Sequence, residues 1–398
     1  PLLIGGATTS RVHTAVKIAP VYSGAVVHVN DASKSVPVSG SLLSKDLKSG
    51  FLNELKIEYD RLREQNKNAQ SQKKFISLEE ARKNKFPVNW SQAKIHTPKK
   101  PGTTVFKNFD LSEIVRYIDW TPFFHSWELK GSYPKILSDP ERGIEAKKLF
   151  DDAQKMLEQI ISENWLEARA VVGIYPANSN LNDDIEVLDE TGNIKCLFHT
   201  IRQQTKKPAG QYNVALSDFI KPTTEKTGTD YLGVFALSAG FGIDEHVKRF
   251  EANHDDYNAI LLKALADRLA EAFAELMHEK VRKEIWGYDA NEKLSNQELI
   301  NEKYIGIRPA PGYPAQPDHT EKETIWKLLD VENQIGMTLT ESLAMIPTAA
   351  VSGLYFANNA SHYFGVGKIN KDQVEDYAKR KQKANEVMER WLGTVLAY

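Results

Sequence analysis

The stretch that most restricts the fold of this chain is the run from Arg308 to Pro314, with the sequence Arg-Pro-Ala-Pro-Gly-Tyr-Pro. Three prolines and one glycine in seven residues exclude a helix interior or a central strand. Because proline has no N–H group, carbonyl groups in this run need partners from outside it or from a ligand. A rigid loop with one arginine, free carbonyls and one tyrosine suits a small charged molecule, since arginine can bind a carboxylate through two hydrogen bonds. A proline-rich surface turn is the alternative interpretation.

Length and composition limit the classes of protein to consider. The chain has 398 residues and a formal net charge of −2. That length is enough for two or three domains, and the charge argues against a protein that binds nucleic acid through bulk positive charge. We find no apolar run of about 18 residues and therefore expect no membrane span. The single Cys196 excludes an internal disulfide and a cysteine-cluster metal site, which fits a reducing cytoplasm.

The first part of the chain resembles the end of a doubly wound α/β domain. We expect buried strands at 2–4 and 24–29, each followed by a loop of small residues, at 5–10 and 30–33. Such sheets bind ligands at the carboxyl ends of their strands, although an ordinary strand-to-helix turn explains two adjacent glycines equally well. Because the sequence starts inside an apolar strand, we expect the chain to be a fragment of a larger protein.

Residues 49–76 are highly charged and helix-forming, which predicts an interdomain linker. Ser77 and Glu80 then predict a capping box that starts a helix. Beyond this point helical and strand-like patterns do not alternate regularly, which favours an α+β fold with an antiparallel sheet. The expected helices are 111–118, 144–162, 255–286, 371–381 and 384–392. The expected strands are 169–175, 185–188, 195–200, 231–237 and 363–369.

The segment from Asp255 to Trp286 is the clearest predicted helix, because apolar residues recur at intervals of three or four and give one buried face. Carboxylates follow at intervals of four on another face, and like charges at that spacing repel by about 0.2–0.5 kcal/mol per pair. Arg268 and Lys280 can offset them; alternatively Asp267 and Glu271 face a positively charged ligand or a partner protein. The carboxylates are Asp267, Glu271, Glu275 and Glu279.

A second candidate lies between Tyr117 and Phe124, where several aromatic residues surround Asp119. A carboxylate among aromatic rings is costly to bury unless it is paired. Asp119 can therefore bind an ammonium group, or it can cap the turn before Pro122. Later in the chain Tyr363 and Phe364 are adjacent on a predicted strand, so only one of the two side chains can line a given pocket.

Together these motifs resemble the cobalamin-dependent methionine synthase family, over essentially the whole chain. The matching fragments are Leu3 to Ser10, Tyr117 to Phe124, Arg308 to Pro314, His319 to Lys322 and Thr340 to Met345. The resemblance implies a remnant of a cobalamin-binding domain at 1–48, a linker at 49–76 and an S-adenosylmethionine-binding activation domain at 77–398. The last domain is expected to be curved, with a twisted antiparallel sheet and flanking helices.

The resemblance also implies a methyltransferase that serves methionine biosynthesis. This part of the enzyme would bind S-adenosylmethionine and use it for reductive methylation of oxidised cob(II)alamin, with an electron from a flavodoxin-like reductase. The domains for homocysteine, with its zinc, and for folate would lie upstream. We therefore do not expect this chain to make methionine alone, or to hold cobalamin tightly.

Site residues are implied position by position. Asp119 matches the carboxylate that contacts the ligand's ammonium group, and Arg308 matches the arginine on its carboxylate. No side chain is expected to act as a general acid or base. Further ligand contacts are implied at Ala310, Tyr313, Tyr363, Phe364, Glu302, Asp267 and Glu271. The rim around the nucleotide tail of cobalamin is implied at Gly5, Gly6 and Ala32.

Two other functions remain open from the sequence. The first is a docking module for a flavodoxin-like reductase that caps the cobalamin domain. Because flavodoxins are acidic, it predicts a basic patch, with candidate lysines at 73–74, 99–100 and 379–383. The second is an unrelated nucleotide-binding protein, which the lack of a glycine-rich phosphate loop disfavours.

Overall fold

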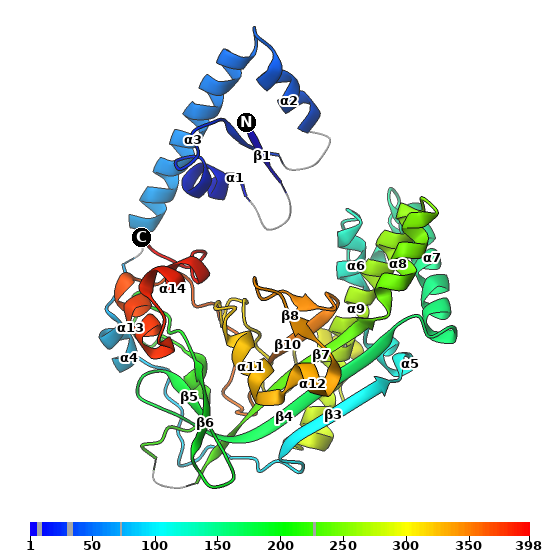
Figure 1. Cartoon of the computed structure of the whole chain (residues 1–398). Coiled ribbons are helices and arrows are strands. Elements are labelled where there is room, and N and C mark those ends of the chain that lie inside the picture. The colour runs from blue at the N-terminus through cyan, green and yellow to red at the C-terminus, as the bar shows by residue number, and fades with distance from the viewer. Residues whose placement is uncertain (6–9, 30–34, 72–73, 226–227) are drawn as a thin grey trace. The chain divides into compact units, whose positions relative to one another are not determined.

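The computed structural model describes residues 1–5, 10–29, 35–71, 74–225 and 228–398. These residues form two compact units that meet in sequence between Phe75 and Ile76 (Figure 1). Each unit has a hydrophobic core of its own.

The smaller unit contains two short parallel strands and a long helix. Leu2 lies opposite Val26, so the two predicted strands pair in parallel. The prediction that the first of them is buried is wrong, because Leu2 is exposed and Leu3 and Ile4 are only partly buried. The charged segment predicted as a linker is a helix that buries Leu55 and Tyr59 in the core of this unit. Its elements are β1 (Leu2–Ile4), α1 (Arg11–His13), η1 (Thr14–Ile18), β2 (Val26–His28), α2 (Ser35–Leu43) and α3 (Lys48–Ser71).

The larger unit is built around a six-stranded antiparallel sheet with the order β10-β7-β4-β5-β6, in which β3 also pairs with β4. The first part of β4 pairs with β3 and its last residues pair with β5, so both strands lie along the same edge of β4. The predicted α+β class with an antiparallel sheet is therefore confirmed. The strands are β3 (Gly102–Phe109), β4 (Glu167–Ser179), β5 (Asp184–Leu188), β6 (Ile194–His199), β7 (Asp230–Phe241) and β10 (Ala350–Tyr355). A separate hairpin joins β8 (Thr338–Leu339) and β9 (Met345–Ile346).

Helices cover both faces of this sheet, so β4 and β7 are buried at nearly every position (Figure 1). Alternate residues of β4 belong to different cores: Val172 lies in the core that contains Leu262 of α9, whereas Val171 lies in the core that contains Ile325 of α11. The helices of the first half are α4 (Leu78–Lys83), α5 (Leu111–Ile114), η3 (Val115–Tyr117), α6 (Trp120–Ser126), η4 (Lys135–Ser138), α7 (Gly143–Ser162), η5 (Leu216–Phe219) and α8 (Ile243–Ala252). Those of the second half are α9 (Asp256–Lys280), η6 (Val281–Ile285), α10 (Asn296–Ile300), α11 (Glu321–Leu329), α12 (Val331–Ile335), α13 (Lys371–Lys381) and α14 (Asn385–Trp391).

Helix α9 carries the buried face that its sequence predicts. Leu262, Leu265 and Leu269 are fully buried against the sheet. The side chain of Asp255 accepts a hydrogen bond from the N–H of Asn258 and so caps the helix N-terminus. None of the helices in the described ranges is long and apolar enough to cross a membrane.

One predicted strand is wrong. Residues 363–369 do not form a strand; they run as a loop in which the N–H of Val366 donates to the carbonyl of Pro314 at 2.8 Å. Gly367 has a φ of +73°, which interrupts an extended backbone. The aromatic run that suggested a strand is therefore a connection lying beside the proline-rich segment.

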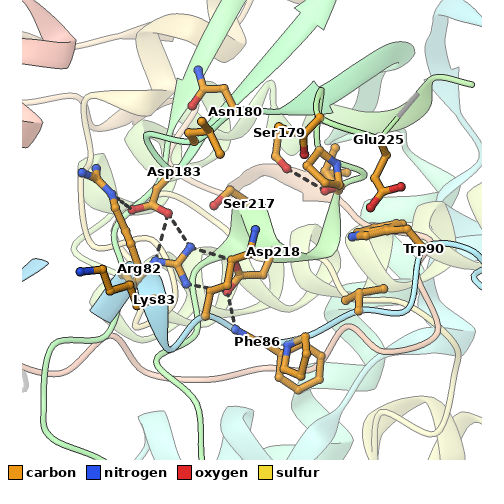
Figure 2. A pocket seen from close by; sticks show the side chains of 18 of the residues that line it. Arg82, Lys83, Phe86, Trp90, Ser179, Asn180, Asp183, Ser217, Asp218 and Glu225 are labelled. Carbon is orange, nitrogen blue, oxygen red and sulfur yellow. Dashed lines mark hydrogen bonds and ion pairs between the residues drawn. The ribbon is translucent and has the colours of Figure 1, made fainter. Parts of the chain in front are cut away.

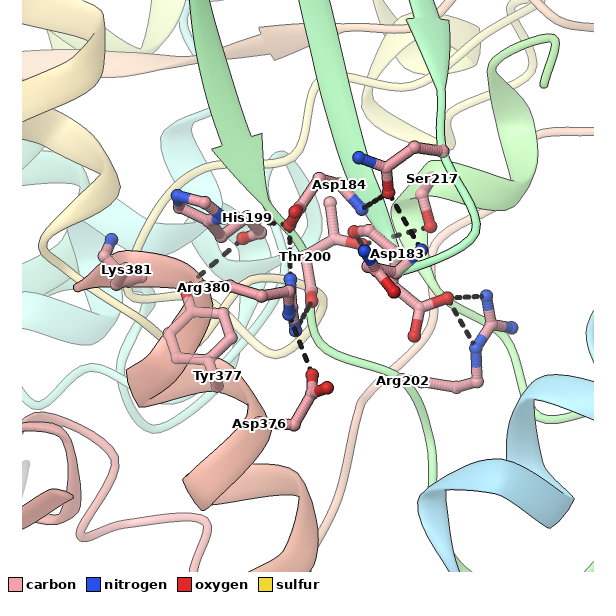
Figure 3. A network of polar contacts seen from close by, with 12 residues as sticks. Asp183, Asp184, His199, Thr200, Arg202, Ser217, Asp376, Tyr377, Arg380 and Lys381 are labelled. Atoms are coloured by element: carbon pink, nitrogen blue, oxygen red, sulfur yellow. Dashed lines mark hydrogen bonds and ion pairs between the residues drawn. The ribbon is translucent and has the colours of Figure 1, made fainter. Parts of the chain in front are cut away.

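A buried polar network attaches α13 to the far end of the sheet (Figure 3). Arg380 pairs with Asp184, which also accepts from Nδ1 of His199 at 2.8 Å. Lys381 lies 2.9 Å from Asp318 and is almost completely buried. These charges are paired with one another, so the network anchors α13 to the sheet.

Candidate functional site

The proline-rich run is a rigid turn, held at both ends by main-chain hydrogen bonds. The carbonyl of Pro309 accepts from Leu354 of β10 at 2.9 Å, and that of Pro314 accepts from Val366. This confirms that carbonyls of the run find partners outside it. Gly312 has a φ of +93°, and a Cβ added there would lie 2.1 Å from Cε1 of His319. Both the backbone conformation and the histidine ring therefore require glycine.

Arg308 opens this run and lines a cavity of about 300 Å³. Its walls come from α9, from the segment that leads into α6, and from the chain between α10 and the proline-rich run. Four carboxylates and two guanidinium groups line it, which leaves two negative charges in excess and favours a cationic ligand. These residues are Asp119, Glu271, Glu275, Glu302, Arg268 and Arg308.

Arg308 is paired on one side and open on the other. Its Nη1 donates to Oε2 of Glu275 at 2.6 Å, and its main-chain N–H donates to the hydroxyl of Tyr363 at 3.0 Å. Burial alone would lower the pKa of Arg308, but the adjacent Glu275 carboxylate outweighs it and raises that pKa, so the guanidinium stays charged. Within the described ranges its Nε and Nη2 have no hydrogen-bond partner, and the side chain is 20% exposed. One edge of the guanidinium is thus available to a ligand.

The position of Asp119 agrees with both roles considered from the sequence, the cap of a turn and a ligand-binding carboxylate. One carboxylate oxygen accepts from the N–H of Thr121 at 2.9 Å and caps α6. The residue also lines the acidic cavity, and its other oxygen has no hydrogen-bond partner among the residues that the structure describes. Capping therefore fixes the side chain without using all of its acceptor capacity.

The cations that offset the carboxylates on the acidic face of α9 differ from those that were predicted. Glu275 pairs with Arg308, and Glu279 pairs with Lys283. Lys280 lies 3.3 Å from Glu284, so the prediction that Lys280 offsets this face is wrong. The cause is local, because Glu284 lies one turn further along the chain on the same side as Lys280.

The other predicted ligand contacts lie around the cavity rather than in its wall. Tyr363 is partly exposed beside Arg308, whereas Phe364 packs edge-on against Phe219 in the core, with ring centres 6.2 Å apart. The Phe364 side chain therefore does not reach the cavity. Tyr313 is 60% exposed on the turn, and its N–H donates to the carbonyl of Ala310.

Two predicted acidic residues differ in position. Glu302 lines the cavity just after α10, and burial raises its pKa while Arg308 opposes that shift. Asp267 is exposed one turn before Glu271 and does not line the cavity. Of the predicted cobalamin rim, Gly6 and Ala32 lie outside the described residues. Gly5 follows β1, and a Cβ there would lie 3.0 Å from the carbonyl oxygen of Val29, so strand packing alone accounts for a glycine.

Sequence reasoning assigned no ligand role to Glu275, Arg268 or Tyr304, which also line the cavity. A signal existed for Glu275, because it follows Glu271 by four residues and so lies on the same helix face. No pattern in the sequence singled out Tyr304.

A second cavity, of about 560 Å³, lies next to α4 (Figure 2). Its buried charged groups are paired within the protein. Arg202 binds Asp218 through two hydrogen bonds of 2.7 and 2.8 Å and also contacts Asp183, which in turn accepts from Arg82 at 2.9 Å. We therefore regard the acidic cavity around Arg308 as the better candidate site.

Comparisons with known proteins agree with this choice of region. Residues 110–382 match the family model of the vitamin B12 dependent methionine synthase activation domain. The chain is also similar to the crystal structure of the MetH reactivation domain bound to AdoHcy, with 50% sequence identity and a TM-score of 0.79. That alignment covers 81% of this chain and 99% of the other. Since the family match spans more than half of the sequence and includes the acidic cavity, the chain belongs to the vitamin B12 dependent methionine synthase family and carries its activation domain.

Proposed function

We propose that this chain binds S-adenosylmethionine in the acidic cavity, and that the methyl group of this ligand is transferred during reactivation of methionine synthase. The cavity's two excess carboxylates carry the proposal, because S-adenosylmethionine is a net cation with a sulfonium, an ammonium and one carboxylate. The related reactivation domain was crystallised with AdoHcy, the product that remains when S-adenosylmethionine has lost its methyl group.

The charged groups suit the two ends of such a ligand. The open edge of Arg308 can bind the ligand's carboxylate through two hydrogen bonds, and the free oxygen of Asp119 can accept from its ammonium group. Glu271 and Glu302 line the same cavity and stabilise a sulfonium electrostatically.

We assign the residues around the cavity to the rest of the ligand. The ring of Tyr363, fixed by its hydrogen bond to Arg308, is on the adenosine side, and Phe364 contributes through its backbone. Ala310 and Tyr313 form the adjoining turn. Asp267 acts only at long range in this scheme, because it lies one helical turn away from the cavity wall.

The methyl acceptor in this scheme is cobalamin, which when bound supplies a reduced cobalt centre as the nucleophile. The residues of this chain act by positioning. Arg308 and the carboxylates fix the donor so that its methyl group has one direction of approach, and holding two reactants in line lowers the barrier without proton transfer. Gly5, Gly6 and Ala32 remain the proposed rim around the cofactor's nucleotide tail.

Within the whole enzyme we propose that residues 1–48 end the cobalamin-binding domain and residues 77–398 form the activation domain, in the cytoplasm. A flavodoxin-like reductase would supply the electron. As a docking module for that reductase the chain has fewer candidate lysines than the sequence suggests. Lys381 is buried against Asp318 and Glu321, and Lys73 lies outside the described residues.

A methyl-transfer assay tests the proposed function. This chain is joined to a complete cobalamin-binding domain of the family, and transfer of a labelled methyl group from S-adenosylmethionine to cobalamin is followed at a controlled reducing potential. We expect transfer to fall strongly in Arg308→Ala and Asp119→Asn, and to persist in Glu251→Gln, which removes a surface carboxylate on α8. Equal transfer by all of these variants would contradict the assignment.

A further inference from the structure

Two walls of the acidic cavity are joined by a hydrogen bond. One wall is the segment that carries Tyr117 and Asp119, and the other is the face of α9 that carries Glu271 and Glu275. The hydroxyl of Tyr117 donates to Oε2 of Glu279 at 2.7 Å. Glu279 follows Glu275 by one helical turn and therefore lies on the same side of α9. The bond thus ties the segment to the helix beside the cavity.

The acceptor of this bond is a charged carboxylate. Burial alone would raise the pKa of Glu279, but hydrogen bonds from Lys283 and Tyr117 outweigh it and lower that pKa. Lys283 pairs with the other oxygen, Oε1, and leaves Oε2 to Tyr117. A hydroxyl that donates to a carboxylate forms a charge-assisted bond, which is stronger than a bond between neutral groups. The bond therefore holds Tyr117 firmly against α9.

The distance of Asp119 from α9 depends on this bond. The hydrogen bond that Asp119 accepts from Thr121 is local, so it orients the side chain at the start of α6 but does not fix the segment relative to α9. Ile118 is buried in the core that also contains residues of α9, and apolar packing of this kind is not directional. Within the described ranges, the bond from Tyr117 is the only hydrogen bond between residues 111–126 and α9.

We propose that Tyr117 is a positioning residue that acts through Asp119, because its hydrogen bond to Glu279 sets the distance between the Asp119 carboxylate and the acidic face of α9. A ligand that contacts both walls binds tightly only when their separation is right. Functional groups generally need a supporting layer of contacts that holds them to within about 0.5 Å. This inference rests on the proposed function and adds a supporting contact to it.

A double-mutant cycle with Asp119 tests this role. Calorimetry measures the Kd of S-adenosylmethionine for the wild-type chain, Tyr117→Phe, Asp119→Asn and the double variant. Tyr117→Phe keeps the ring and removes only the hydroxyl, and we expect it to raise Kd by about 3- to 30-fold, as for residues coupled in one network. In the Asp119→Asn chain the same change should raise Kd by less than about twofold, because the carboxylate that Tyr117 positions is already absent.

Variants of Glu279 and Tyr257 provide the rescue and the matched control. Glu279→Gln keeps an acceptor for the Tyr117 hydroxyl and should bind the ligand more tightly than Glu279→Leu, which removes the acceptor and should resemble Tyr117→Phe. The hydroxyl of Tyr257 donates to Asp152 at 3.0 Å and links the same helix to α7, outside the cavity lining. Tyr257→Phe should therefore leave Kd unchanged. An equal loss of affinity in Tyr257→Phe and Tyr117→Phe would overturn the proposal, because it would reflect a general loosening of α9.

The remaining outcomes separate this inference from the proposed function. Wild-type affinity in Tyr117→Phe, with weaker binding in Asp119→Asn, would overturn the role of Tyr117 alone. An equal effect of Tyr117→Phe in both chains would overturn it as well, because Tyr117 would then act independently of Asp119. If Tyr117→Phe failed to fold, equal binding by Glu279→Gln and Glu279→Leu would be the contrary result. A folded wild-type chain that binds no S-adenosylmethionine would overturn the proposed function and this inference together.

Discussion

The ion pair between Arg308 and Glu275 should have separable effects on stability and on ligand binding. In Arg308→Ala the Glu275 carboxylate stays buried, with 10% of its side chain exposed, and loses its only cation among the described residues. Breaking a buried pair from one side costs about 3–5 kcal/mol. We expect a value near the lower end, because Arg308 itself is 20% exposed. Adding Glu275→Gln removes the uncompensated charge and should restore most of that free energy of unfolding.

Binding should not recover with stability. Loss of the charge-assisted hydrogen bonds between Arg308 and the ligand's carboxylate removes about 1.5–3 kcal/mol, which is about a 10- to 100-fold increase in Kd. The double variant lacks the arginine as well and should bind at least as weakly as the single variant.

Two assays on the same preparations separate these effects. Urea unfolding, followed by circular dichroism, gives the free energy of unfolding, and calorimetry gives the Kd for S-adenosylmethionine. A double variant with wild-type affinity would refute the role of Arg308 in binding. A single variant as stable as wild type would refute the buried ion pair.

Three further predictions concern the larger unit. Burial holds the pKa of His278 well below 6.5, so below that pH the unfolded chain binds a proton at this residue and the folded chain does not. The free energy of unfolding is therefore unaffected by this group above pH 6.5 and decreases below it by up to about 1.4 kcal/mol per pH unit. When urea unfolding is measured between pH 7 and 5, the free energy of unfolding should depend less steeply on pH in His278→Gln than in the wild type. An equally steep dependence on pH would contradict this prediction. Burial raises the pKa of Cys196 to about 12. Ellman's reagent at pH 8 should therefore label the folded chain more than about 1,000-fold more slowly than the urea-unfolded chain, because the thiolate is the reactive form. Similar labelling rates would contradict the burial of this thiol. Gly312→Ala should lower the free energy of unfolding by about 1–3 kcal/mol, because alanine is strained at φ +93° and its Cβ would collide with His319. Adding His319→Ala should remove only the collision. A Gly312→Ala chain as stable as the wild type would disprove the strain.

Much of the fold was predictable because local patterns and tertiary packing agree. The period of Leu262, Leu265 and Leu269 matches a helix that packs one face on the sheet. The segment 363–369 was mispredicted because its aromatic residues favour a strand, while none of the strands in the described ranges pairs with it. Strand propensity depends on pairing partners, and a single sequence does not reveal them.

The site was predictable only in part, for a related reason. Arg308 and Asp119 stood out because a proline-rich run and an aromatic cluster are unusual settings for charges. The pair of Arg308 with Glu275 joins residues 33 positions apart, and helical spacing alone does not show which turn of α9 faces the loop. For this reason Asp267 was assigned to the ligand and Glu275 was not.

Calorimetric titration of S-adenosylmethionine into the wild-type chain, with Arg308→Ala and Asp119→Asn in parallel, tests the central claim most directly. We expect one ligand per chain, with both substitutions raising Kd and the fold unchanged by circular dichroism in Asp119→Asn. A well-folded wild-type chain that binds no S-adenosylmethionine, or binding that neither substitution weakens, would contradict the placement of the methyl-donor site in this cavity.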